Sequence, residues 1–129
     1  MGHVLKTYSR LAVAVALAAA LAGCAQMRPN DPQSVASSVA QSLYNNDYNG
    51  TIANFDDTLK SQATRTQVAM VSDKMHALGD YQGLTLTKSD DDTRRYWFDA
   101  KFSNGDMTVE LRLHANGQVA AYRLLPKTS

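Results

Sequence analysis

Two Asn-Gly pairs, Asn104-Gly105 and Asn116-Gly117, separate segments in which apolar residues alternate with polar ones. Asn-Gly between alternating segments is the strongest short-range signal for a β-hairpin, because both loop residues can take positive φ. The sequence therefore predicts an antiparallel meander after Gly79. Its four strands carry the apolar residues Leu84 and Leu86; Tyr96, Phe98, Ala100 and Phe102; Met107, Val109, Leu111 and Leu113; and Ala120, Tyr122 and Leu124.

The two loops also predict which residues face each other across the sheet. With Ser103 opposite Asp106, Phe98 lies opposite Leu111. With Ala115 opposite Gln118, Leu111 lies opposite Tyr122 and Val109 opposite Leu124. Both turns place the apolar residues on the same face, and their agreement is better evidence for a buried face than either pattern alone.

The other face of the predicted sheet gathers charged side chains and the only tryptophan. In this register Trp97 lies opposite Arg112 and Glu110 opposite Arg123, which predicts cross-strand charge pairs and a cation–π contact. Two interpretations remain open: a solvated sheet face, or an interaction face formed by Trp97, Arg112 and Arg123. The full set on this face is Trp97, Asp99, Lys101, Glu110, Arg112 and Arg123.

Before Gly79 the apolar residues recur at helical spacing. Asp31-Pro32 is typical of an N-cap followed by the first helical residue, and it predicts a helix from about 32 to 45. Thr64 and Gln67 form a capping-box pattern that predicts a helix from about 65 to 78.

Between these two helices, a turn is expected at residues 47–50. Ile52, Phe55 and Leu59 then share one face of a shorter helix. Three helices followed by a meander predict an α+β fold, in which N-terminal helices pack on one face of a curved four-stranded antiparallel sheet.

The N-terminal residues have the organisation of an export signal. Lys6 and Arg10 precede an unbroken apolar run from Leu11 to Ala22, which is shorter than the roughly 20 apolar residues that span a bilayer. Removing residues 1–23 as a signal peptide leaves 11 basic against 12 acidic residues, so the formal charge changes from +1 to −1. This balance gives no indication of nucleic-acid binding.

The residues Leu21-Ala22-Gly23-Cys24 resemble the bacterial lipoprotein signal, or lipobox. The resemblance implies that diacylglycerol is attached to the Cys24 thiol, that the chain is cut before Cys24, and that residues 24–31 form a lipid-anchored tether. Ala25 follows where aspartate would favour the inner membrane, so we expect an outer-membrane location facing the periplasm. Cys24 is the only cysteine, which excludes a disulfide within the monomer.

Residues 32–126 are expected to form one domain, and the stretch from Val35 to Pro126 resembles the DUF3887 family of the NTF2-like, or cystatin-like, superfamily. The motifs that carry the resemblance are Asp47-Tyr48, Phe55-Asp56, Ala77-Leu78-Gly79 and the closing segment 116–126. Such folds often hold a pocket between helices and sheet, and relatives often dimerise. Residues that could line a pocket for a small apolar ligand are Tyr44, Tyr48, Phe55, Tyr96, Phe98 and Tyr122, although ordinary core packing explains the same positions.

Two hypotheses for function follow. The favoured one is a lipid-anchored envelope protein that binds a small ligand, an envelope partner or a second copy of itself. The alternative is a pocket enzyme resembling isomerases or dehydratases, for which Asp56 is the one weak acid–base candidate and a capping role the preferred explanation. We expect no cofactor and no metal, because His76 and His114 lack zinc-site spacing and Asp90-Asp91-Asp92 lacks the glycine and glutamate of a calcium loop.

Overall fold

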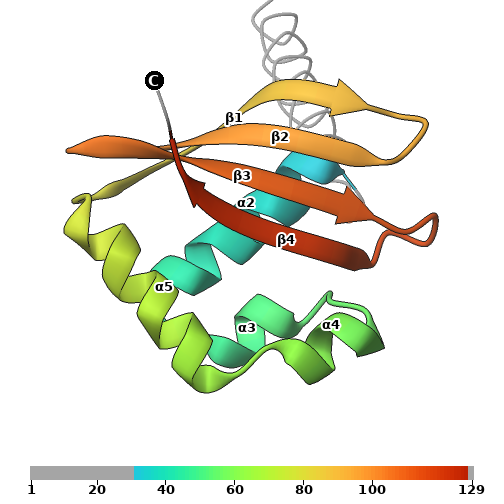
Figure 1. The fold of residues 1–129 in the computed structure, drawn as a ribbon, viewed down its shortest axis with the longest axis horizontal. Coiled ribbons are helices and arrows are strands. Elements are labelled where there is room, and N and C mark those ends of the chain that lie inside the picture. Colours follow the sequence, from blue (N-terminus) through green and yellow to red (C-terminus); the bar gives the residue numbers. More distant parts are fainter. Residues whose placement is uncertain (1–30, 128–129) are drawn as a thin grey trace, which may run out of the picture.

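The computed structural model describes residues 31–127, which form an α+β fold as predicted. Figure 1 shows the helices on one face of a curved antiparallel sheet, with α2 running across it. The strands lie in the order β1-β2-β3-β4. The signal peptide 1–23, Cys24 and all of the tether 24–31 except Asp31 lie outside the described residues. The elements are α2 (Pro32–Tyr44), α3 (Tyr48–Ile52), α4 (Asp57–Gln62), α5 (Arg65–Ala77), β1 (Tyr81–Asp90), β2 (Arg95–Phe102), β3 (Gly105–Leu113) and β4 (Val119–Pro126).

The core lies between helix α2 and the inner face of the sheet. Phe98 and Val109, which are register partners on β2 and β3, are fully buried, as is Ala36 on the facing side of α2. Burial of a large apolar side chain contributes about 1.5–3 kcal/mol, so this row of contacts fixes which face of the sheet points inward.

Two of the predicted helices begin where their caps place them. The Asp31 carboxylate accepts a hydrogen bond from the Ser34 backbone N–H at 3.1 Å, and Pro32 follows as the first helical residue of α2. Helix α5 opens with the predicted capping box between Thr64 and Gln67. Both interactions satisfy N–H groups that a helix start leaves without partners.

The segment between these helices differs from the prediction. The turn expected at residues 47–50 is instead the start of α3, capped by Asp47, and the single helix expected to contain both Phe55 and Leu59 is interrupted. Phe55 forms a parallel bridge with Val119 of β4, and Asp56 begins the separate helix α4. The pairing with β4 is a tertiary interaction, and local helical spacing carries no information about it.

The β2–β3 hairpin keeps the predicted buried face but has a different register. The two-residue loop is Ser103-Asn104, and Gly105 is paired with Phe102, so Phe98 faces Val109 instead of Leu111. The loop is held by the end of α5, because the Asn104 N–H donates to the Leu78 carbonyl at 2.8 Å. A shift of two residues moves each partner but leaves every side chain on its face.

Gly79 allows the end of α5 to contact the β2–β3 loop. Its φ of +96° is in the left-handed region that terminates helices, and an added Cβ would collide with the Ser103 hydroxyl.

The predicted β3–β4 register is confirmed, with Leu111 opposite Tyr122 and Val109 opposite Leu124, and the ladder is irregular only beyond Arg112.

Strand β1 is an edge strand with two irregularities in its pairing to β2. One lies between Leu86 and Lys88, and Leu86 is 46% exposed while Leu84 packs against the core. Bulges and charged side chains on an edge strand hinder pairing with other chains.

Within residues 31–127, no helix combines the length and apolarity needed to cross a membrane.

We predict that Phe98→Ala destabilises the domain by about 3–5 kcal/mol, because it removes a fully buried aromatic side chain from the centre of the core. Urea unfolding followed by circular dichroism measures the change. Lys101→Ala, on the other face of the same strand, is the matched control and should change stability by about 1 kcal/mol or less. Equal effects of the two substitutions would contradict the assignment of the faces.

Candidate functional site

The outer face of the sheet, which helices α2 to α5 leave uncovered, has two halves of different charge balance. In one half every charge is paired: Lys127 contacts Asp99 at 2.9 Å and Asp106 at 3.8 Å, and Lys101 contacts Asp106 at 3.1 Å. The hydrogen bond to Asp99 raises the pKa of Lys127, which keeps it charged. This half matches the interpretation of a solvated sheet face.

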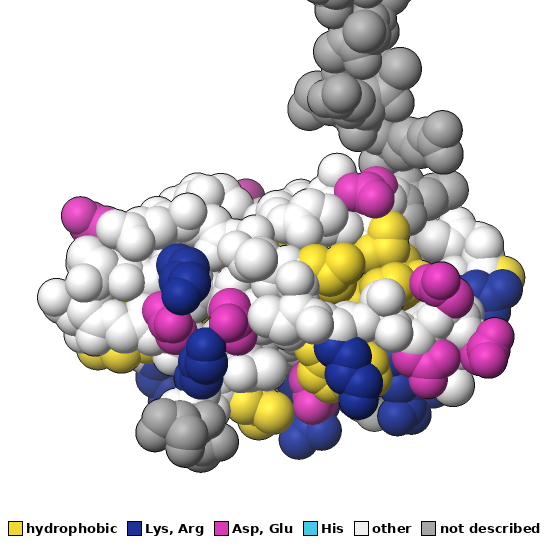
Figure 2. Space-filling model, turned by 90° about the horizontal axis from the view of Figure 1, so that it is seen from above, with side chains coloured by type: hydrophobic (Ala, Val, Ile, Leu, Met, Phe, Trp, Pro, Cys, Tyr) yellow, Lys and Arg dark blue, Asp and Glu magenta, His cyan; other side chains and the backbone are white. Residues whose placement is uncertain are grey.

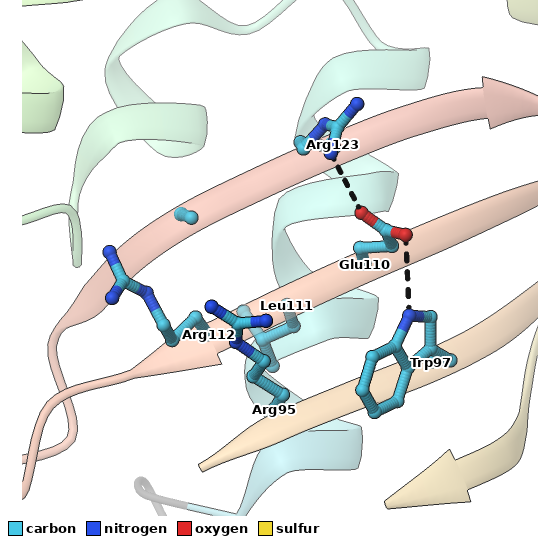
Figure 3. A pocket seen from close by; sticks show the side chains of 7 residues that line it. Arg95, Trp97, Glu110, Leu111, Arg112 and Arg123 are labelled. Atoms are coloured by element: carbon cyan, nitrogen blue, oxygen red, sulfur yellow. Dashed lines mark hydrogen bonds and ion pairs between the residues drawn. The ribbon is translucent and has the colours of Figure 1, made fainter. Parts of the chain in front are cut away.

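The other half contains a hollow of about 380 Å³, which we call the arginine hollow. Strands β2, β3 and β4 each contribute to it, and Figure 3 shows Arg95, Trp97, Glu110, Arg112 and Arg123 on the outer face; only Leu111 belongs to the core on the inner face. Three cations and one carboxylate line it, so the charges do not balance. The lining residues are Arg95, Trp97, Glu110, Leu111, Arg112, Ala121 and Arg123.

Trp97 and Glu110 form one side of the arginine hollow. The indole N–H of Trp97 donates to Glu110 at 3.3 Å, and Arg123 donates to the second oxygen of the same carboxylate at 3.2 Å (Figure 3). Glu110 is opposite Arg123, as predicted, but Trp97 is opposite Glu110 and not Arg112. The predicted cation–π contact with Arg112 is therefore wrong; Lys88 lies over the Trp97 ring, 4.7 Å from its centroid.

Arg95 and Arg112 form the other side, and they are register partners on adjacent strands. Figure 3 shows Arg95 reaching from β2 toward Arg112 on β3. Among the described residues neither guanidinium makes an ion pair, although Glu110 lies in the same hollow. Like charges directly opposite each other destabilise a sheet, so this arrangement is not explained by stability.

Arg95 was not among the predicted site residues. The strand was expected to begin at its apolar residue Tyr96, and the expected hairpin register gave Arg112 a different partner. The doublet Arg94-Arg95 directly before Tyr96-Trp97 is the sequence signal that could have indicated it.

The view of the molecule from above in Figure 2 shows side chains of mixed charge. Figure 2, seen from above the view of Figure 1, shows acidic and basic side chains interspersed beside exposed hydrophobic ones. Opposite charges near one another attenuate the field over this surface. The adjacent uncompensated cations of the arginine hollow contrast with this pattern.

The predicted aromatic pocket residues are divided between the core and a shallow groove. Phe55 and Phe98 are buried, and the four tyrosines pack against the core. Phe55 and Tyr122 also line an apolar groove of about 280 Å³ between the helices and β4. The other predicted pocket residues, which do not line this groove, are Tyr44, Tyr48, Tyr96 and Phe98.

Three tyrosine hydroxyls are engaged with the backbone. Tyr122 donates to the Ala36 carbonyl at 2.9 Å, Tyr48 to Ala63 at 3.2 Å and Tyr44 to Gly79 at 3.3 Å. Burial raises the pKa of Tyr122 well above its ordinary value. The lining of the apolar groove includes no carboxylate and no histidine, so the carboxylate that the enzyme hypothesis requires is not among its lining residues.

Asp56 serves as the N-cap of α4, the role preferred in the sequence analysis. Its carboxylate accepts from the Leu59 backbone N–H at 2.7 Å and contacts His114 Nε2 at 2.6 Å. These hydrogen bonds, the backbone one first, lower the pKa of Asp56. His114 follows β3 directly, so the contact ties α4 to the end of the sheet.

Within residues 31–127 no group of three or more His, Cys, Asp or Glu side chains is arranged to hold a metal ion. Comparison with protein-family models, with curated proteins and with solved structures gives no match for this chain. The resemblances to lipoproteins and to the DUF3887 family therefore stay predictions.

We predict that Asp56→Asn lowers stability in a pH-dependent way. A lowered folded-state pKa means that the ionised carboxylate stabilises the fold above the unfolded value of about 3.9. That contribution is lost as the pH falls through the folded-state pKa. Asparagine also caps helices, so the substitution removes the charge and retains a capping side chain.

The measurement is the urea midpoint from pH 2 to 7, with Asp57→Asn as the neighbouring control that lacks the His114 contact. The midpoints of wild type and Asp56→Asn should differ at pH 6 and converge at the acid end. A difference that stays constant over this range would contradict the assigned interaction.

Proposed function

We propose that this chain is a lipid-anchored envelope protein whose folded domain binds a partner protein through the outer face of its sheet. The observation that carries the proposal is the arginine hollow. There, two adjacent guanidinium groups that form no ion pair with any described side chain lie beside Trp97, on a face that none of the helices of residues 31–127 covers. Arginine and tryptophan dominate the binding energy of many interfaces.

The anchor in this proposal is supported by the order of charge, apolar run and lipobox in residues 1–24. Each buried methylene of an attached lipid contributes about 0.8 kcal/mol, so two or three acyl chains hold a protein firmly to a membrane. Helix α2 begins at Pro32, and a fully extended tether from Cys24 to that point spans at most about 30 Å. The outer sheet face would therefore meet its partner close to a membrane surface.

The small-pocket interpretation has less support. The apolar groove between the helices and β4 is open to solvent, and no charged side chain lines it. The hydroxyls of Tyr44 and Tyr48, which were expected at a pocket, donate to backbone carbonyls instead. Membership of the DUF3887 family would fit either interpretation, because a fold by itself does not define an activity.

We predict that Cys24→Ala moves the protein from the membrane fraction to the soluble fraction of the envelope. Intact-mass spectrometry should show the diacylglycerol addition on wild type and its absence from the variant. Ala25→Ser, which keeps the cysteine, is the control and should stay in the membrane. A Cys24→Ala protein that is exported and still found with the membrane would refute the anchor.

A photo-crosslinking amino acid tests the binding face. Lys88 is exposed beside Trp97, whereas Lys60 is exposed on helix α4 in the helical layer. We predict that a crosslinker at position 88 gives an adduct of one defined mass in cells, and that position 60 gives none. Adducts of the same pattern from both positions, or none from position 88, would contradict the proposal.

A further inference from the structure

The arginine hollow has an excess of two positive charges that no described side chain neutralises. Glu110 is the one carboxylate that lines it, and both of its oxygens already accept hydrogen bonds, one from Trp97 and one from Arg123. Within residues 31–127, neither the Arg95 nor the Arg112 guanidinium forms a hydrogen bond or an ion pair with a side chain, and the two lie in neighbouring positions as a pair of forked donors.

Two further carboxylates lie in the vicinity of these arginines. Asp90 on β1 is the register partner of Arg95 on its other side, but it makes no ion pair with Arg95, and Figure 3 shows Arg95 directed toward β3. Asp56 is near enough for Arg112 to lower its pKa, yet its carboxylate is engaged by Leu59 and His114. Neither group completes the arginine hollow.

We propose that the arginine hollow binds one carboxylate side chain of the partner protein, held between Arg95 and Arg112, with Trp97 as the adjoining wall. The inference rests on the proposed function and specifies the chemistry of its ligand. A guanidinium presents parallel N–H groups that match the two oxygens of a carboxylate, and such bidentate pairs combine strength with fixed orientation. A bound anion also relieves the repulsion between the two facing arginines.

The surroundings favour a single monovalent group over a polyanion. Asp90, Glu110 and Asp56 border the two arginines, so a nucleic acid or a highly phosphorylated surface would place several charges against carboxylates. A carboxylate brings one negative charge, and Ala121 opposite Arg112 leaves space for the short side chain that carries it.

Trp97 provides a direct measurement, because it is the only tryptophan of the chain and lies inside the arginine hollow. Full-length lipidated protein in a non-ionic detergent is titrated with a capped single-glutamate peptide, acetyl-Ala-Glu-Ala-amide, at low ionic strength, and Trp97 emission is followed. Parallel titrations use the matched glutamine peptide, acetyl-Ala-Gln-Ala-amide, sodium acetate and inorganic phosphate. We expect a saturable change with the single-glutamate peptide that weakens as salt is added, and no saturable change with the matched glutamine peptide.

Arg95→Gln and Arg112→Gln should each weaken binding of the single-glutamate peptide roughly tenfold or more, since each removes charge-assisted hydrogen bonds. Arg95→Lys keeps the charge without the fork and should weaken it to a smaller extent. Lys101→Gln, on the neutralised half of the same face, is the matched control and should bind as wild type does. Near-ultraviolet circular dichroism checks that every variant is folded.

Three results would overturn the inference: no saturable response to the single-glutamate peptide, equal weakening by Lys101→Gln, or tighter binding of phosphate than of the peptide. Acetate binding as tight as the peptide would also overturn it, because it would indicate a small organic acid instead of a partner side chain. If the titration gives one of these results but the crosslinker at position 88 still gives a specific adduct, the proposal that the outer sheet face binds a partner is retained, and only the carboxylate ligand is rejected. Loss of both results would reject the proposed function as well.

Discussion

The contact between the end of helix α5 and the β2–β3 loop determines which residues of the outer sheet face become neighbours. Asn104 donates to the Leu78 carbonyl and Ser103 to the Asp80 carbonyl, so the loop must consist of Ser103 and Asn104. Every pair along β2 and β3 follows from that loop. Arg95 is opposite Arg112, and Trp97 is opposite Glu110, only because the hairpin turns at this position.

This register places like charges together, which a sheet selected for stability alone would avoid. The repulsion between the two arginines can be offset by the core, because the buried side chains on the inner face of β2 and β3 stabilise their pairing whichever residues lie on the outer face. Unfavourable local arrangements that persist in a well-packed structure are typical of binding sites, where a ligand supplies the missing interaction.

The alternation of apolar residues is sufficient to predict four strands and the buried face, because both registers of the β2–β3 hairpin give the same faces. Helical spacing and the cap residues predict the helical layer. It could not predict the pairing itself, which depends on a distant segment at Leu78. The same limit applies to Phe55: its helical spacing with Ile52 and Leu59 is real, but its bridge to Val119 overrides it. Arg95 was missed for a related reason, since a charged residue at the start of a strand adds nothing to an apolar pattern.

The end of the sheet that contains Arg112 is held from the helical side. Val119 exchanges backbone hydrogen bonds with Asn54 and Asp56, the Asn54 side chain donates to the Gly117 carbonyl, and the Asp56 carboxylate contacts His114. These contacts fix both ends of the β3–β4 loop and, through it, the strands that carry Arg112 and Ala121. A guanidinium on a rigid backbone loses less conformational entropy when it binds an anion than one on a mobile loop. The non-helical segment between α3 and α4, which pairs with Val119, therefore contributes to preorganisation of the arginine hollow.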